Sequence, residues 1–271
     1  MKCLHLLVIV LILAVTVIAQ KTGAFPSGRV IDLTYAFDAN SVYWPTAEQF
    51  KLETDFEGTT DKGYFYSAYR YSAAEHGGTH LDSPVHFAKG HFTVDQLPLE
   101  QLMGAGVVID VTTKCANNPD YLVSVADIEN WEKQNGRIPA GTIVLLRTGY
   151  GKFYPDRKKY LGTEERGAEA VAKLHFPGLD PAAARWITQN RSIKAIGLDT
   201  ASIDYGQSQL FERKLIDCVM TFGEVHGRIE MRAAMLRRRV AVSRVEVALV
   251  SYSFEISFEF ELLGSGPIDA I

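Results

Sequence analysis

The hydrophobic pattern of the chain predicts several short strands, most of them buried. Largely apolar runs occur at residues 106–111, 141–149 and 193–198. Runs of this length with glycine or polar residues at their ends are typical of buried strands. Residues 63–73 read as an aromatic-rich strand, and residues 30–33 as a short one. These five segments are expected to form the sheets of the fold.

Helices are predicted between these strands from their capping residues. Ser124 precedes a helix that extends to residue 133, and Asp180-Pro181 supplies a cap and a first-turn proline for a helix to about residue 190. Strands and helices therefore alternate through the middle of the chain, which predicts a mixed α/β domain. Further on, residues 254–262 alternate strictly between apolar and polar, so a strand with one buried face is expected there.

Residues 1–19 have the pattern of a secretory signal peptide. Lys2 provides a positive charge, residues 6–18 form an apolar run, and cleavage is expected after Ala19. A membrane anchor is the alternative, but the run is shorter than the roughly 20 residues that a spanning helix needs. We therefore expect a secreted, extracellular protein whose mature part, residues 20–271, forms one domain with no membrane contact.

The composition is that of an ordinary globular protein. With 271 residues, 47% of them hydrophobic and 22% charged, the chain can bury one substantial core. The formal net charge of −4 argues against a nucleic-acid partner as the main function. Cys115 and Cys218 allow one disulfide in an oxidising compartment, but the sequence leaves its formation open.

Three histidines and a carboxylate fall within eleven residues: His76, His80, Asp82 and His86. Their even spacing places all four on one face of an extended segment, although a straight strand would put the first and last about 33 Å apart. One ion, with bonds of about 2.0–2.2 Å, cannot span that distance. The segment must therefore bend, and we expect the bends at Gly77-Gly78 and at Pro84. Imidazole and carboxylate together favour zinc, manganese or iron(II).

Two other interpretations of the cluster are weaker. The first is that these are ordinary surface residues without a shared role. Four such residues by chance in so short a stretch would be an unusual coincidence. The run His76-Gly77-Gly78 could also be the oxyanion loop of a serine esterase, but that reading needs a G-x-S-x-G nucleophile elbow. No such pentapeptide occurs in the chain.

The run H-G-G-T-H-L-D-S-P-V-H-F at residues 76–87 resembles the H-x-G-T-H-x-D-x-P-x-H signature of the metal-dependent cyclase-like hydrolases. This family includes bacterial-type kynurenine formamidase and isatin hydrolase. The resemblance extends more loosely from residue 30 to residue 208, and it includes residues 43–45 and the stretch G-L-D-T-A-S-I-D at 197–204.

The resemblance implies a swivelling β/β/α fold and a role for each motif residue. His76, His80 and Asp82 would bind the metal, His86 would donate and accept the proton, and Trp44 would contact the substrate. Simple packing is the alternative for Trp44, as it is for many tryptophans beside proline. Members of the family are usually dimers or larger, so a homo-oligomer is expected.

The chain departs from the family after about residue 208. In the formamidase branch, a later histidine and a glutamate about a dozen residues beyond it complete a second metal position. In this chain Arg238 stands twelve residues after His226, so the pattern does not match. Other residues that could approach the metal are Glu212, Glu224 and Glu230, and residues 209–271 are considered atypical.

Together these features predict a metal-dependent amidohydrolase that acts on a small aromatic amide. A bound divalent cation lowers the pKa of water and polarises a carbonyl, and a nearby histidine can carry the proton. N-formylkynurenine is the first expected substrate, which would make the protein an arylformamidase of tryptophan catabolism. Isatin or another cyclic amide is the second. A catalytically weak binding protein on the same fold is the alternative. The metal is expected to be zinc or manganese, as one or two ions.

Overall fold

The structure is a computed structural model that describes residues 31–208 and 246–248. The chain divides into two units, Met1–Asp32 and Leu33–Ile271, and every helix and strand of the described residues belongs to the second. Several predictions lie outside the described residues and stay predictions. They concern the signal peptide at 1–19, the strand at 254–262, Cys218, Glu212, Glu224, His226 and Glu230.

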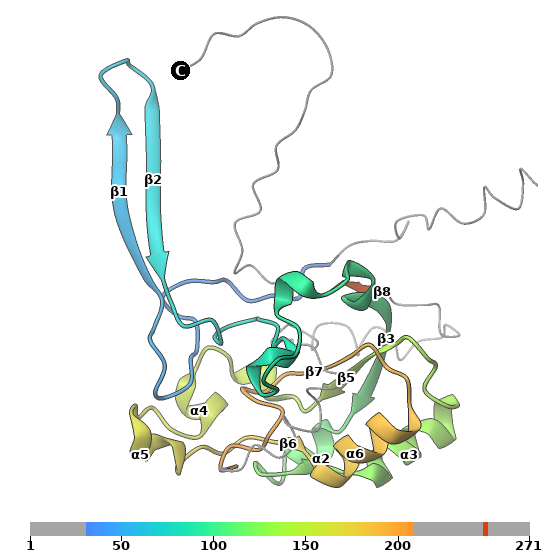
Figure 1. The fold of residues 1–271 in the computed structure, drawn as a ribbon. Coiled ribbons are helices and arrows are strands. Elements are labelled where there is room, and N and C mark those ends of the chain that lie inside the picture. Colours follow the sequence, from blue (N-terminus) through green and yellow to red (C-terminus); the bar gives the residue numbers. More distant parts are fainter. Residues whose placement is uncertain (1–30, 209–245, 249–271) are drawn as a thin grey trace, which may run out of the picture. The chain divides into compact units, whose positions relative to one another are not determined.

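The largest sheet has four strands in the order β7-β5-β3-β8 (Figure 1). Its strands are β3 (Met103–Asp110), β5 (Ile143–Arg147), β7 (Ala195–Leu198) and β8 (Glu246–Ala248). The first three run parallel, and β8 pairs antiparallel with β3. Every residue of β7 and all but the last of β5 are buried, as expected for parallel strands that are covered on both faces. This burial explains why these strands appear in the sequence as continuous apolar runs.

Two capped helices connect the strands. The helix α3 (Val125–Asn135) begins with a capping box in which Ser124 and Asp127 each satisfy a backbone N–H of the other. The helix α6 (Pro181–Asn190) begins at Asp180, whose carboxylate accepts a hydrogen bond from the N–H of Ala182. Both helices lie together below the sheet in Figure 1. The predicted helices are therefore confirmed at their first residues.

The described residues form two smaller sheets as well. The strands β1 (Lys51–Thr59) and β2 (Phe65–Ser72) form an antiparallel hairpin whose residues are almost all exposed. Across this hairpin, Arg70 binds Glu53 and Asp55 through ion pairs of 3.2 and 2.6 Å. The two-residue strands β4 (Leu122–Val123) and β6 (Gly178–Leu179) pair in parallel. The remaining elements are single turns and short helices: η1 (Pro84–His86), η2 (Val94–Gln96), η3 (Leu99–Gln101), α2 (Thr112–Cys115), η4 (Tyr150–Phe153), α4 (Arg157–Leu161) and α5 (Ala168–Val171).

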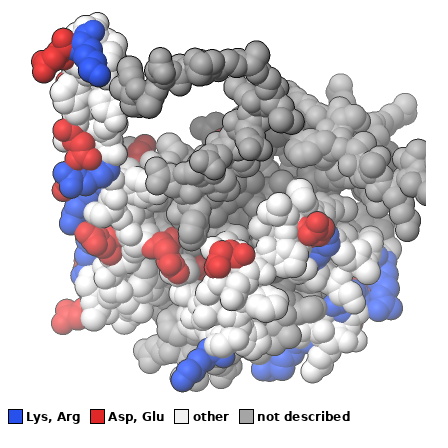
Figure 2. Space-filling view, turned by 45° about the horizontal axis from the view of Figure 1, so that its top comes forward, with Lys and Arg blue, Asp and Glu red and all other residues white. Residues whose placement is uncertain are grey.

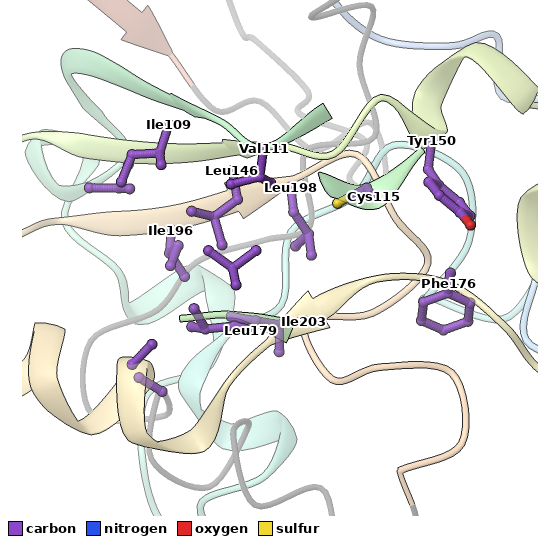
Figure 3. Close-up of a cluster of buried hydrophobic side chains, with 14 of the residues drawn as sticks. Ile109, Val111, Cys115, Leu146, Tyr150, Phe176, Leu179, Ile196, Leu198 and Ile203 are labelled. Atoms are coloured by element: carbon purple, nitrogen blue, oxygen red, sulfur yellow. The ribbon is translucent and has the colours of Figure 1, made fainter. Parts of the chain in front are cut away.

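The hydrophobic core lies between the parallel strands and the segments that pack on them. Leu146 of β5 and Ile196 and Leu198 of β7 converge with Leu179 and Ile203 in one cluster (Figure 3). Cys115 is buried at the edge of the same cluster, and burial raises the pKa of its thiol to about 12, with a further contribution from Asp199. The sequence leaves the pairing of Cys115 with Cys218 open, and Cys218 lies outside the described residues.

Most of the predicted elements are confirmed, and one is wrong. Strands lie within the segments 63–73, 141–149 and 193–198, β3 overlaps the segment 106–111 but begins three residues earlier, and the mixed α/β class is confirmed. The predicted strand at residues 30–33 is wrong over its described part, because residues 31–33 belong to no strand. Ile31 is 44% exposed, so this short apolar segment lacks the buried face that would favour a strand. Among the described residues, no helix is both long enough and apolar enough to cross a membrane.

Candidate functional site

The histidine-rich segment is held against residues 42–44. Gly77 forms an antiparallel bridge with Tyr43, and the N–H of Gly78 donates a 3.1 Å hydrogen bond to the carbonyl oxygen of Val42. The ring of Tyr43 lies against Gly77, so that a Cβ atom at position 77 would come within 2.0 Å of Tyr43 Cε1. Only glycine fits this contact. The first glycine of the motif therefore allows the ligand segment to lie beside Tyr43 and Trp44.

The segment bends where the sequence predicts. Gly78 has a φ of +61°, in the left-handed region that favours glycine. Pro84 occupies the first turn of η1, a position where its missing N–H costs nothing. Between these two points the chain forms neither helix nor turn. The two bends bring the histidines and the carboxylate together although a straight segment would keep them far apart.

Three side chains form a candidate metal-binding group: His76, His80 and Asp82. Asp82 Oδ1 lies 2.5 Å from His76 Nδ1 and 3.4 Å from His80 Nε2. The rings of His76 and His80 cross at 73°, so the lone pairs of these two nitrogens can converge. His80 is buried, and the side chain of Asp82 is 19% exposed. The group is therefore largely shielded from solvent on one side.

The hydrogen bond of His80 selects its ligand atom. His80 Nδ1 lies 3.1 Å from the carbonyl oxygen of Gly78. A carbonyl oxygen only accepts, so Nδ1 must carry the proton and Nε2 presents its lone pair toward Asp82. Metal-binding histidines characteristically donate their other ring N–H in this way. The backbone of the motif thus prepares His80 for a cation.

The ligand types, two imidazoles and a carboxylate, suit a zinc-type or manganese-type cation, and the spacing of one ligand pair matches a tetrahedral ion. Two ligand atoms that bind one tetrahedral ion at about 2.0–2.2 Å lie about 3.3–3.6 Å apart. The 3.4 Å between His80 Nε2 and Asp82 Oδ1 matches this spacing. The 2.5 Å between His76 Nδ1 and Asp82 Oδ1 is shorter, so these two atoms would have to separate to bind the same ion.

His86 lies beside this group. Its Nε2 is 4.0 Å from Asp82 Oδ2, beyond hydrogen-bond distance. Its ring is stacked on that of His76, with centroids 3.7 Å apart, and it meets Phe87 edge to face. The structure therefore brings together the four residues that the motif singles out, and their individual roles stay predictions.

An apolar cavity of about 260 Å³ opens at this group. Its aromatic lining consists of Tyr43, Trp44, Phe87 and Tyr160. Trp44 also meets Phe176 edge to face at 6.3 Å. Both alternatives that the sequence leaves for Trp44 are therefore compatible with its position, because it lines the cavity and also packs against the core. No Lys, Arg, Asp or Glu is among the described residues that line the cavity, whereas Figure 2 shows both acidic and basic side chains exposed on the surface.

A further part of the cavity lining comes from the segment after β7. Ala201 and Ser202 line the cavity just beyond the carboxyl end of this strand, where ligands characteristically bind in open α/β sheets. The buried carboxylate of Asp199 accepts hydrogen bonds from the N–H and hydroxyl of Thr148 and from the N–H of Gly149, at 2.7 to 2.8 Å. Asp199 thereby joins the carboxyl ends of β5 and β7 behind the site.

Glu75 and Tyr160 escaped the sequence analysis, and Tyr43 and Phe87 entered it only as parts of the resembling segments, without a role of their own. Burial raises the pKa of Tyr43 to about 12, with smaller contributions from Tyr154 and Tyr71. Its buried hydroxyl makes no hydrogen bond within the described part of the chain. Tyr43, Glu75 and Phe87 each stand next to a residue that was singled out, so proximity to the motif was the available signal. Tyr160 comes from α4, and no local pattern connects it to the motif.

Comparison with known proteins assigns the chain to a family. The model of the family described as "Putative cyclase" matches residues 31–205, which is well over half of the chain. The chain belongs to this cyclase family. The expected family and fold class are thereby confirmed.

Isatin hydrolases are among the similar proteins. The isatin hydrolase of Roseibium aggregatum is 29% identical over 188 residues, which cover 63% of this chain and 68% of that protein. The structure of isatin hydrolase A from Ralstonia solanacearum has a TM-score of 0.63 at 28% identity and covers 74% of this chain and 80% of that one. An isatin hydrolase bound to the product analogue thioisatinate has a TM-score of 0.63 at 25% identity, over 73% of this chain and 78% of that one.

Proposed function

We propose that this cyclase-family protein is a metal-dependent hydrolase that opens an amide bond in a small, neutral aromatic compound. A cyclic amide of the isatin type is the proposed substrate class. One observation carries the proposal: a candidate ligand group of two histidines and a carboxylate lies at an apolar, aromatic cavity, with a further histidine at its edge. Hydrolysis at such a site needs a cation, a proton carrier and a wall for the substrate, and each has a candidate in this cavity.

His76, His80 and Asp82 would hold the cation, which supplies polarisation of the amide carbonyl and of the attacking water. His86 would take a proton from that water as the new C–O bond forms. It would then return the proton to the amide nitrogen as the C–N bond breaks. Trp44 would cover one face of the aromatic ring.

The lining of the cavity supports a neutral substrate. N-formylkynurenine carries an ammonium and a carboxylate group, and burial of unpaired charges is costly. The described lining residues include no charged partner for either group apart from histidine. Ligand pockets typically hold about 300–1,000 Å³, so the cavity of about 260 Å³ suits a small compound. Since similar proteins are isatin hydrolases, we rank a cyclic amide first and the N-formylkynurenine activity expected from the sequence second.

A substrate panel tests this proposal. Purified protein loaded with Zn²⁺ or Mn²⁺ is assayed with isatin, formanilide and N-formylkynurenine, and the products are separated by liquid chromatography. The highest kcat/KM is expected with isatin, and it should fall in chelator-treated protein. A higher kcat/KM with N-formylkynurenine would overturn the substrate ranking. Cation binding without turnover of any compound would favour the binding-protein alternative and overturn the proposed activity.

Secretion and self-association are further proposals. Secretion is supported by residues 1–19, which lie outside the described residues, and amino-terminal sequencing of protein from the medium tests cleavage after Ala19. A homo-oligomer is supported by the family resemblance, and light scattering of the purified protein tests it. A mass equal to that of the single chain would overturn the second proposal.

A further inference from the structure

Both ring nitrogens of His76 face a carboxylate. Nδ1 lies 2.5 Å from Asp82 Oδ1, and Nε2 lies 2.9 Å from Glu75 Oε1. The two carboxylates differ in their surroundings, since the side chain of Asp82 is 19% exposed and that of Glu75 is 79% exposed. One nitrogen therefore faces the candidate metal group, and the other faces a carboxylate at the surface.

Glu75 also belongs to a second group that could hold a cation, with His76 and His86. Ring geometry argues against that reading. An imidazole binds a cation in the plane of its ring, along the lone pair of the nitrogen. The rings of His76 and His86 are stacked 3.7 Å apart and are tilted by only 28°. Because the two ring planes are nearly parallel and lie 3.7 Å apart, one ion cannot lie close to both planes at bonding distance from both rings.

The contact between Glu75 and His76 is better explained as an orienting hydrogen bond. We infer that Glu75 is a positioning residue: it accepts a hydrogen bond from the Nε2–H of His76 and thereby presents Nδ1 as the ligand atom. Carboxylate–histidine–metal arrangements of this kind fix both the tautomer and the ring orientation. The inference rests on the proposed metal site. It also assigns opposite ligand atoms to the two histidines, Nδ1 in His76 and Nε2 in His80.

The expected effect on cation affinity is moderate. Loss of such an orienting partner costs about 10–100-fold in metal affinity. Because Glu75 is exposed, water competes for the hydrogen bond, and the lower end, about tenfold, is expected. The same exposure means that a substitution at position 75 should leave the fold intact.

Zn²⁺ affinity measured by chelator competition tests the inference. The dissociation constant should rise about tenfold in Glu75→Ala. Glu75→Gln should stay within about threefold of wild type, because its amide oxygen still accepts from Nε2–H. The number of ions bound at saturation should be the same in all three proteins. Glu129→Ala, a change at an exposed glutamate of α3, serves as the matched control and should leave the affinity unchanged.

Four results would overturn the inference. An unchanged dissociation constant in Glu75→Ala would show that the hydrogen bond does not position His76. Equal weakening in Glu75→Gln and Glu75→Ala would assign the effect to charge alone. Loss of an ion at saturation would make Glu75 itself a ligand. If wild-type protein binds no cation, the proposed function fails as well, and this outcome is distinct from the other three.

A spectroscopic measurement provides an independent readout. Long-range ¹H–¹⁵N correlation spectra of the Zn²⁺-loaded protein distinguish the two histidine tautomers. His76 is expected to carry its proton on Nε2, and His80 on Nδ1. A spectrum in which His76 carries its proton on Nδ1 would contradict the inference.

Discussion

The imidazole rings of His76 and His86 are stacked, with centroids 3.7 Å apart and planes 28° apart. The first is a candidate ligand and the second the proposed proton carrier. The ring contact holds His86 against His76, whereas His86 Nε2 lies 4.0 Å from Asp82 Oδ2, beyond hydrogen-bond distance. In the proposed mechanism, this arrangement keeps the proton carrier next to the candidate ligands.

Substitution of His86 by alanine separates proton transfer from cation binding. General acid–base catalysis contributes about 10²–10⁴-fold, so turnover by His86→Ala should fall by at least about a hundredfold. The amount of bound metal should remain that of wild type, because the three candidate ligands are intact. Both quantities are measured on the same sample, by product formation and by elemental analysis. His91→Ala is the control, because His91 is an exposed histidine five positions further along the chain, and its turnover should equal that of wild type. Normal turnover by His86→Ala would exclude His86 as the proton carrier.

Replacement of Trp44 tests the substrate wall. An aromatic contact contributes about 0.5–1.5 kcal/mol beyond simple burial, so KM should rise about two- to tenfold in Trp44→Ala. Since the contact is the same in the ground and transition states, kcat should change little. Trp44→Phe keeps an aromatic face and should retain most of the affinity. If KM is unchanged in Trp44→Ala while stability falls, Trp44 only packs against Phe176.

Gly77→Ala should damage both stability and the site. The new Cβ would lie 2.0 Å from Tyr43 Cε1, and Tyr43 is almost fully buried, so its ring cannot move aside. Overpacking of this kind costs about 1–3 kcal/mol of the free energy of unfolding, which urea denaturation measures. Gly58→Ala is the control, because its nearest atom would be Phe56 Cζ at 3.9 Å; a change within about 0.5 kcal/mol is expected there. Equal stability of the two variants would contradict the proposed role of Gly77.

The stability of the protein should fall at acidic pH through Asp127. Burial tends to raise the pKa of this carboxyl, but hydrogen bonds from Lys114, Ser124 and Tyr121 outweigh it and lower the pKa below its ordinary value. A lowered pKa contributes stability above the unfolded value of about 3.9 and loses it as the pH falls through the folded value. Asp127→Asn should therefore be less stable than wild type at pH 7, and the difference should shrink below about pH 4. Urea unfolding between pH 7 and pH 3 measures it, and a constant difference would refute this assignment.

The sequence predicts the buried part of the fold well for a physical reason. The strands β5 and β7 are covered on both faces, so their residues are uniformly apolar and visible as runs. The first turns of α3 and α6 are equally visible, because Ser124 and Asp180 provide local caps. In such elements the local preference and the tertiary environment agree.

The elements that the sequence analysis missed depend on distant partners. The strand β1 is exposed and rich in charged residues, and it is held by its pairing with β2. The two-residue strands β4 and β6 exist only because they pair with each other. By contrast, the motif predicted that His76, His80 and Asp82 come together, because the bends that bring them together lie within the motif itself. The contribution of Tyr160 could not be predicted, since it depends on where α4 packs.

Removal and return of the metal tests the central claim most directly. Chelator-treated protein is titrated with Zn²⁺ or with Mn²⁺ while isatin hydrolysis and bound metal are measured together. We predict that turnover is lost on chelation, returns in proportion to bound metal, and does not return in His80→Ala, which lacks one candidate ligand. Turnover that is independent of bound metal, or the same recovery in His80→Ala, would contradict the account.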